Sequence, residues 1–238
     1  MTPAPAHRRV SNAVRPPRFG SFGREVRRAL RWIDAVHRDG TLPTLPLRPL
    51  AAPLAGETHG AYWHGDYASP SIEVWRGSPF LWLICIHEIG HLLDDAGFGL
   101  PSGQFASESS PLLQAWRDAV ATTRAHTRLT GLLALPRYRE SDANGQSHLV
   151  CYEEVTLANG VTIERPVDVE LVRYAATWRE LFARAYVQYI VKESDDARLR
   201  EQFVRLREDE RAVVHWGNDD YVPVHDALDA LMHARGWR

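Results

Sequence analysis

The stretch Ser78-PFLWLICIHEIGHLLDDAG-Phe98 decides how the chain is interpreted, because it joins an apolar helical pattern to a His-Glu-x-x-His motif. Ser78 suits the N-cap of a helix, Pro79 suits its first position and Gly97 is a typical C-terminal stop. Gly90, inside the motif, is the one interruption of the run. The stretch therefore predicts an apolar helix that carries histidine and glutamate side chains.

The motif places His87, Glu88 and His91 on neighbouring parts of that helix. Residues four apart lie on one face, one turn apart, so both imidazoles can reach one metal ion. Glu88 lies about 100° round the helix from His87, still near that face. Two neutral imidazoles suit Zn²⁺, and a carboxylate beside them can take a proton from water held by the metal. The motif predicts metalloprotease chemistry, and a helix that merely carries two histidines is the alternative.

The composition is that of a globular protein with a core of its own. The chain has 238 residues, of which 45% are hydrophobic and 24% charged, and its formal net charge is −2. This balance argues against a polyanion binder as a whole, and two cysteines, Cys85 and Cys151, are too few for a disulfide framework. No signal-peptide pattern or bilayer-length apolar run is present. We therefore expect a cytoplasmic protein without a membrane partner, although export without a cleaved signal remains compatible.

Composition also suggests three segments. Residues 1–23 predict a flexible arm rich in arginine and proline, and residues 24–57 predict an N-terminal helix followed by a proline-rich extended connector. Residues 58–238 then form the main domain. The arginines of the arm could contact nucleic acid or an acidic protein, but a solvated tail is the simpler interpretation.

A strand is expected directly before the motif helix. Ile72 and Val74 alternate with Glu73 and Trp75, so the two pairs point to opposite faces. An extended peptide can add to an exposed strand edge through backbone hydrogen bonds. These four residues are therefore the candidate substrate-binding strand.

The rest of the chain predicts an α+β protein whose C-terminal half is mostly helical. Asn159-Gly160 between alternating apolar residues is a strong hairpin signal. The expected order after the motif helix is a loop at 98–110, a helix at 111–128, a hairpin at 146–165, helices at 168–192 (broken near Thr177) and 195–211, and a last segment from 222 that starts extended and ends helical.

A catalytic zinc site needs a third protein ligand and an open position. Two common spacings fail, because Asp94 and Gly97 occupy the positions three and six residues after His91. Asp94 and Asp95 are expected to solvate or orient the end of the helix. Glu108, His126 and His148 are candidates by residue type, each with a surface or core position as its simpler interpretation.

A second motif makes a resemblance specific. His87-EIGH-His91, followed far downstream by Glu180-LFARA-Tyr186, resembles the lethal-factor-like gluzincins, which include peptidase domains of bacterial toxins and phage-encoded proteins. Their second motif is Glu, two apolar residues, Ala, a variable residue, Ala and an aromatic, and this chain matches it at each position. The resemblance covers mainly residues 71–192. It implies a zincin-like fold with a small sheet packed on the motif helix, a Zn²⁺ cofactor, and Glu180 as the third ligand.

The resemblance also implies a tyrosine upstream of Glu180 that stabilises the oxyanion. Tyr174, six residues before Glu180, is our candidate, although the lethal factor spaces this tyrosine by seven, where this chain has Arg173. Tyr186 is expected to pack in the core. Thr177-x-x-Glu180 is also a capping box, so an alternative role for Glu180 is to bond the Thr177 amide. The ImmA/IrrE-type regulatory peptidases share the mechanism, but their second motif usually follows much sooner.

These observations predict a zinc-dependent endopeptidase acting on a protein or peptide substrate, with Glu88 as general base. Toxin, phage-associated enzyme and stress regulator are all compatible settings. The alternative is a catalytically inactive zincin-like binding module that uses the arginine-rich N-terminus to contact nucleic acid or an acidic protein. A structural zinc site would need a fourth protein ligand, and the sequence offers no obvious one near the helix.

Overall fold

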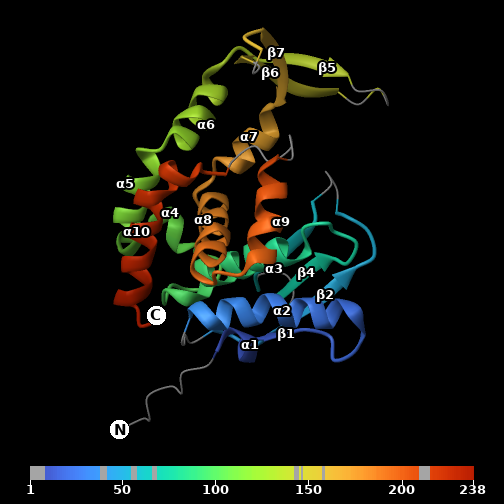
Figure 1. The fold of residues 1–238 in the computed structure, drawn as a ribbon, viewed down its shortest axis with the longest axis vertical. Helices are drawn as coiled ribbons and strands as arrows, with labels where there is room; N and C mark the ends of the chain where they lie inside the picture. Colours follow the sequence, from blue (N-terminus) through green and yellow to red (C-terminus); the bar gives the residue numbers. More distant parts are fainter. Residues whose placement is uncertain are drawn as a thin grey trace.

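Two crossing helices organise the α+β fold (Figure 1). The computed structural model describes residues 9–37, 42–54, 58–65, 69–141, 145, 147–156, 159–208 and 215–238. Helix α3 (Leu81–Leu92) carries the motif and continues as a π-helical turn, η2 (Leu93–Gly97). Helix α8 (Trp178–Glu193) crosses it, and the remaining elements pack around this pair.

The motif helix forms as predicted but begins slightly later. Its N-cap is Phe80, and the Ser78 hydroxyl accepts a hydrogen bond from the Phe80 amide at 3.1 Å. Ser78 therefore organises the turn before α3 and does not cap the helix itself.

Gly90 lies at the crossing point of α3 and α8. A Cβ at this position would lie 3.0 Å from the Ala183 Cα and 3.3 Å from the Tyr186 Cδ1. Small residues on both helices thus permit a close approach of the two backbones. Because Gly90 belongs to the first motif and Ala183 to the second, the crossing also brings the polar residues of both motifs together.

A four-stranded sheet packs beside α3, in the order β1-β2-β4-β3. Its strands are β1 (Val14–Arg15), β2 (Leu45–Leu50), β3 (Gly60–Trp63) and β4 (Ser71–Trp75). Strands β1, β2 and β4 run parallel, and β3 is antiparallel to β4. Strand β4 is therefore interior, whereas β3 has no strand on its outer side among the residues described.

The expected flexible arm is partly wrong. Val10–Ala13 form a short helix, α1, and β1 pairs with β2 directly after it. Val10, Ala13 and Val14 are buried, because this apolar cluster packs against the long helix α2 (Gly20–Val36) and the sheet. Residues 1–8 lie outside the described part of the chain.

The segment 24–57 likewise belongs to the core of the main fold. The predicted helix is present as α2, which packs on α3. The proline-rich connector is extended, as expected, but residues 45–50 of it form β2, between β1 and β4. Residues 38–41 and 55–57 of this segment lie outside the described residues.

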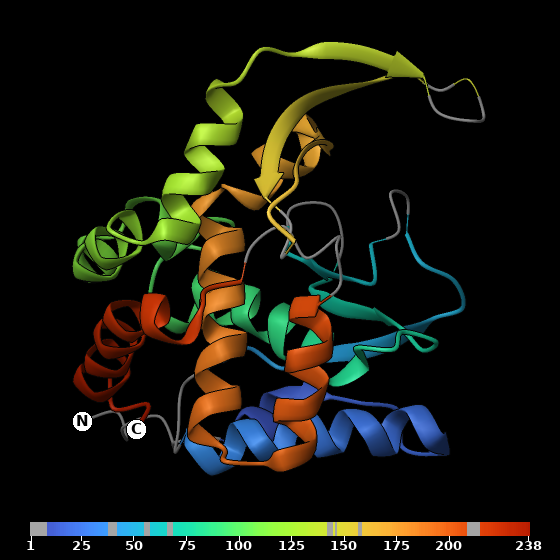
Figure 2. The ribbon, with the colours of Figure 1, turned by 45° about the horizontal axis from the view of Figure 1, so that its top comes forward.

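A second, three-stranded antiparallel sheet projects from the opposite end of the molecule (Figures 1 and 2). It consists of β5 (Tyr138–Ser141), β6 (Ser147–Thr156) and β7 (Thr162–Asp168). The predicted hairpin is confirmed, since β6 pairs with β7 and Gly160 in the turn has a φ of +83°. Left-handed backbone of this kind favours glycine.

The remaining helices differ from expectation at their breaks. The loop at 98–110 contains α4 (Ala106–Ser109), and the predicted helix at 111–128 is split because the Thr123 hydroxyl caps a new helix by accepting from the His126 amide at 3.2 Å. The elements here are η3 (Pro111–Leu113), α5 (Gln114–Ala121) and α6 (Arg124–Ala134). Helix α7 (Val169–Ala175) is separated from α8 near Thr177, as predicted.

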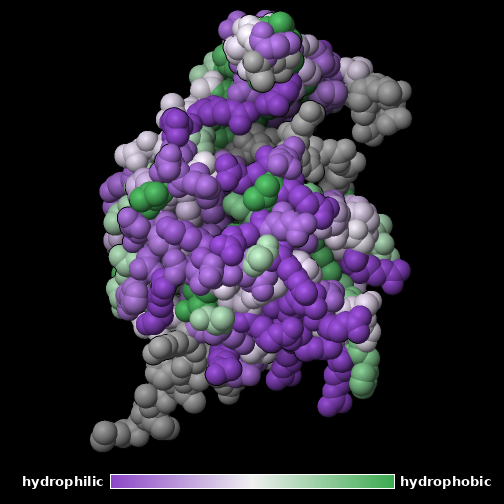
Figure 3. Space-filling view, viewed as in Figure 1, coloured by the Kyte–Doolittle hydropathy of each residue, from purple (hydrophilic) through white to green (hydrophobic). Residues whose placement is uncertain are grey.

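The C-terminal part consists of α9 (Ala197–Glu208) and α10 (Asn218–Ala234). The prediction that residues from 222 start extended is wrong, because Pro223 lies inside α10. Next to it, buried Tyr221 ties this turn of α10 to α8 by donating its hydroxyl to the Ala185 carbonyl at 2.6 Å. Across the described ranges, no helix combines the length and apolarity needed to cross a membrane. The face in Figure 3 is mostly hydrophilic, with apolar residues scattered over it.

Candidate metal centre

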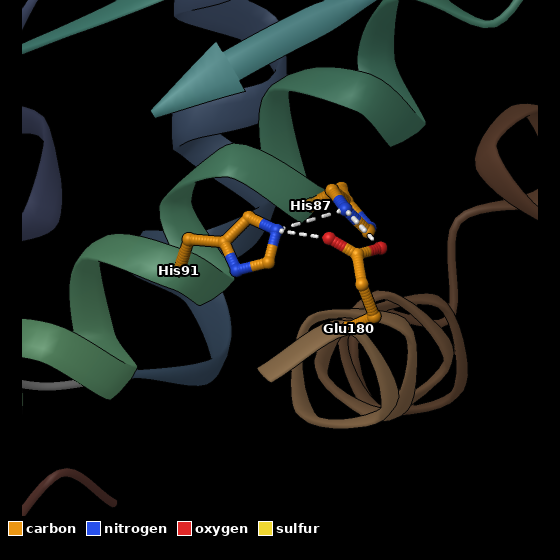
Figure 4. Close-up of side chains that lie close together, drawn as sticks. All are labelled: His87, His91 and Glu180. Carbon is orange, nitrogen blue, oxygen red and sulfur yellow. Dashed lines mark hydrogen bonds and ion pairs between the residues drawn. The ribbon is translucent and has the colours of Figure 1, made fainter. Parts of the chain in front are cut away.

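His87 and His91 of α3 and Glu180 of α8 converge on one point (Figure 4). The two Nε2 atoms lie 3.1 Å apart. One carboxylate oxygen of Glu180 lies 3.1 Å from the His91 Nε2, and the other lies 3.5 Å from the His87 Nε2. Within the described part of the chain, these three residues are the group that could hold a metal ion.

The separations suit a shared metal ion. Tetrahedral zinc, with ligand bonds of about 2.0–2.1 Å, places its ligand atoms roughly 3.3 Å from one another. The two Nε2 atoms lie 3.1 Å apart, close to that value, and each contacts a different oxygen of the Glu180 carboxylate, at 3.1 and 3.5 Å. Two imidazoles and one carboxylate also match the ligand set of catalytic zinc sites. The residues present therefore fit a zinc ion with one position left for water or substrate.

Glu180 is buried and ionised. Its side chain is 2% exposed, and burial by itself raises its pKa, but His87 and His91 outweigh that effect and hold the pKa well below its usual value. Arg184 adds a longer contact to the carboxylate at 3.4 Å. A buried carboxylate that stays ionised in this way is able to bind a metal cation.

The capping-box alternative for Glu180 is not what the structure shows. Thr177 is the N-cap residue of α8, but no side-chain capping bond is made there. The Thr177 hydroxyl instead donates to the Tyr174 carbonyl at 2.9 Å. Both carboxylate oxygens of Glu180 face the histidines (Figure 4).

Glu88 lies between the candidate metal ligands and β3. It is 4% exposed, and burial raises its pKa to about 8, although a hydrogen bond with the Tyr62 backbone acts in the opposite direction. Gly60 makes room for this side chain, since a Cβ there would lie 2.7 Å from the Glu88 Oε1. The local geometry thus holds a carboxyl of near-neutral pKa beside the candidate metal centre.

Two cavities of unequal size meet at the centre. The larger, about 820 Å³, reaches His91 and is bordered by Trp63, Phe105 and Arg179. The smaller, about 190 Å³, reaches His87 and has apolar walls that include Leu83 and Leu206. Both cavities are lined by Glu88, Tyr174 and Glu180. The candidate ligands therefore lie along a continuous opening, with space on both sides.

The structure brings Tyr174 to this opening. It lies on α7, and the residue as a whole is 52% exposed. Its hydroxyl is the buried part: this burial raises the pKa of the phenol, and the nearby Glu180 carboxylate raises it further. The phenol therefore remains protonated and can donate a hydrogen bond. Tyr186 is buried in the core and stacks on His37, with ring centroids 5.5 Å apart, as expected for a packing residue.

The prediction that the strand at 72–75 offers an exposed edge to a substrate is wrong. The residues Ile72, Glu73 and Val74 of β4 pair with β2 on one side and with β3 on the other, and Trp75 pairs with Leu50 of β2. Their backbone therefore cannot take up a further strand. Among the described residues, the available edge is that of β3, which the sequence analysis did not single out. Glu73 still borders the larger cavity and accepts a hydrogen bond from the Trp63 indole at 3.0 Å.

The other candidate ligands lie elsewhere. Glu108 pairs with Arg179 at 3.3 Å, and His126 stacks on Trp178 with ring centroids 5.7 Å apart. His148 lies in β6 of the projecting sheet. None of these three belongs to the converging group found among the described residues.

Asp94 and Asp95 are buried and do not solvate the helix end. Asp94 accepts from the Ser107 amide at 2.7 Å and from the Ser107 hydroxyl at 2.5 Å, and burial raises its pKa to about 7. Asp95 accepts hydrogen bonds from Tyr62 and Gly103. Sequence reasoning missed Gly60, Tyr62 and these pairings. Two adjacent acids after an apolar run were the available signal, because buried charges require partners.

No protein-family model, curated protein or solved structure matches the chain.

Proposed function

We propose that the protein is a zinc-dependent endopeptidase. The observation that supports this most directly is the convergence of His87, His91 and Glu180 beside the buried carboxyl of Glu88. The proposal includes a zincin-like architecture related to the lethal-factor-like gluzincins, in which a small sheet flanks the motif helix and the third ligand comes from a distant helix.

His87, His91 and Glu180 would hold the zinc ion. When bound, zinc supplies Lewis acidity that activates a water and polarises a carbonyl. Glu88 accepts the proton from the attacking water and then delivers it to the leaving amine. The Tyr174 hydroxyl donates a hydrogen bond to the developing oxyanion.

The substrate would lie along β3. The outer edge of this strand borders the larger cavity next to Glu88, so an extended peptide can add to it through backbone hydrogen bonds. The cavities on either side of the candidate ligands leave room for chain in both directions. Such an opening favours cleavage inside a chain over removal of terminal residues.

The non-catalytic alternative receives less support. Two of the arginines within residues 1–31 are engaged within the fold: Arg27 donates to the Pro17 carbonyl at 2.9 Å, and Arg28 pairs with Glu25 at 2.9 Å. The motif glutamate is present and faces the candidate ligands, which a module needing only zinc or only a surface would not require.

Elemental analysis of the purified protein tests the proposal. We expect about one zinc per chain in the wild type and in Glu108→Ala, and a loss of zinc in Glu180→Ala. A peptide library should then be cleaved by the wild type and not by Glu88→Gln. Zinc that survives Glu180→Ala would overturn this ligand set, and absence of zinc after reconstitution would overturn the enzyme.

A further inference from the structure

The buried acid Asp95 bonds to both walls of the larger cavity. It lies in η2, directly after the motif helix, and is 1% exposed. Its Oδ2 accepts from the Tyr62 hydroxyl at 2.6 Å, and its Oδ1 accepts from the Gly103 amide at 2.6 Å. Tyr62 belongs to β3, and Gly103 belongs to the loop that leads to Phe105. Charge-assisted bonds of this length to a buried carboxylate are among the stronger hydrogen bonds in proteins.

On one side, Asp95 fixes β3 relative to the motif helix. The backbone of Tyr62 bonds to Glu88 and its hydroxyl bonds to Asp95, so one residue connects β3 to the helical segment at two points. These two bonds fix the position of the outer edge of β3 relative to Glu88. Because β3 has a paired strand, β4, on one side only, these two bonds add to its order.

On the other side, Asp95 fixes the wall that carries Phe105. The Phe105 ring lies edge-on to His91, with centroids 6.4 Å apart, and the Arg179 guanidinium lies 5.1 Å from its centre. Gly103, two residues before it, has a φ of +84°, a left-handed conformation that glycine tolerates. The Asp95 bond to this amide therefore anchors a tight turn directly before the aromatic wall.

We propose that Asp95 is a positioning residue for the substrate: through Tyr62 and Gly103 it holds the β3 edge and the Phe105 wall at a fixed separation across the cavity. An extended peptide then meets an edge that is already ordered, so the strand loses less freedom when the peptide binds. This inference rests on the proposed peptidase function.

The test compares two tyrosine variants. Tyr62→Phe removes the hydroxyl that donates to Asp95, and Tyr189→Phe removes a hydroxyl that donates to Asp229 at 2.9 Å, away from both cavities. For a long peptide selected by the wild type, we expect Tyr62→Phe to raise KM about tenfold and change kcat less than about twofold, since the bound peptide restores the strand. Tyr189→Phe should lower the melting temperature and leave KM unchanged. Zinc content should stay the same in both variants.

Amide hydrogen exchange of residues 58–65 provides a readout that does not depend on catalysis. Exchange should become faster in Tyr62→Phe and in Asp95→Asn, and remain as in the wild type in Tyr189→Phe. Unchanged exchange in Tyr62→Phe would overturn the inference, and faster exchange with unchanged KM would reduce the bond to a merely structural one. If the wild type cleaves no peptide, the proposed function fails, while the exchange rates still decide whether Asp95 holds the strand.

Discussion

Helix α8 carries a histidine–glutamate contact at each end, and the two differ in what completes them. At the N-terminal end, Glu180 faces two imidazoles of α3. At the C-terminal end, Glu193 contacts one imidazole, that of His225 at 2.7 Å, and its second oxygen bonds to Arg238 at 2.5 Å. The first cluster borders both cavities, and the second borders neither.

The difference shows why a histidine beside a carboxylate does not by itself indicate a metal site. Around Glu193, the Arg238 guanidinium already supplies the positive charge that the carboxylate requires. Around Glu180, two imidazoles and the carboxylate itself converge. The Arg184 guanidinium is 3.4 Å from this carboxylate, a longer contact than the 2.5 Å from Arg238 to Glu193. A metal ion would complete the first cluster and would have no role in the second.

The largest expected effect is on metal binding. Glu180→Ala should reduce bound zinc from about one per chain to almost none, because it removes one of three ligands. Glu193→Ala, at the other end of the same helix, should leave the zinc content unchanged. Elemental analysis after dialysis measures both. Equal zinc loss in the two variants would mean that either substitution disturbs the whole of α8, and would give no support to Glu180 as a metal ligand.

The next effect is on catalysis without metal loss. Glu88→Gln keeps the size of the side chain but cannot accept the proton of the attacking water, so kcat should fall by about 10²–10⁴-fold. The zinc content should remain that of the wild type. Single-turnover cleavage of a peptide selected by the wild type measures the rate, and full activity in this variant would remove Glu88 from the mechanism.

A smaller effect is expected at Tyr174. Tyr174→Phe should lower kcat by about 10²-fold, because one hydrogen bond to the oxyanion is lost, with little change in KM. Tyr138→Phe is the matched control, since Tyr138 is also 52% exposed but lies in the projecting sheet. If the two variants behave alike, Tyr174 does not stabilise the transition state.

Gly60 lies in the crowded candidate site, whereas Gly131 lies in α6 with open space around it. Gly60→Ala places a methyl group 2.6 Å from the Ile84 Cγ2 and 2.7 Å from the Glu88 Oε1, so we expect a destabilisation of about 1–3 kcal/mol and a loss of activity. Gly131→Ala meets no atom within 4 Å in α6 and should stabilise by about 0.5–1 kcal/mol. Urea unfolding and peptide cleavage measure the two effects.

The last contrast concerns His37, a buried histidine that borders neither cavity. His37 is 1% exposed and its Nδ1 lies 3.3 Å from the Trp237 carbonyl; burial lowers its pKa to about 4. The unfolded state therefore binds the proton first as pH falls, so this group should cost up to about 3 kcal/mol of stability between pH 6.5 and pH 4. Metal-free His37→Phe should show a correspondingly weaker loss in this range, and His233→Gln, an exposed control, should not.

Local signals in the sequence were sufficient for much of the site. The four-residue spacing of His87 and His91 defines one helix face, and the break near Thr177 and the Asn159-Gly160 turn follow from residue preferences within a few positions. The approach of Glu180 to the histidines came from a family resemblance, and the structure brings the three side chains together. Their role as zinc ligands remains a prediction.

Non-local pairing explains what was missed. Val14 pairs with Leu45, thirty-one positions away, and no property of the short apolar cluster around it identifies that partner. The interior position of β4 depends on β2, whose prolines suggested a connector. The bonds of Asp95 likewise depend on the position of Tyr62, which secondary-structure preferences cannot give. These three errors concern contacts between segments, whereas the helical start of α10 and the split of the helix at 111–128 are errors in the conformation of a single segment.

The two edges of the four-stranded sheet carry different aggregation hazards. Unpaired strand edges can recruit strands from other copies during folding or at high concentration. On one side, β1 covers part of β2, and Pro49, whose neighbour Leu50 bonds towards β4, lacks the backbone donor that an invading strand would need. On the other side, β3 contains no proline, has no further strand beside it among the described residues, and borders the larger cavity at the candidate metal centre. A charged substitution that protects this edge against aggregation would therefore also hinder the addition of the proposed peptide substrate.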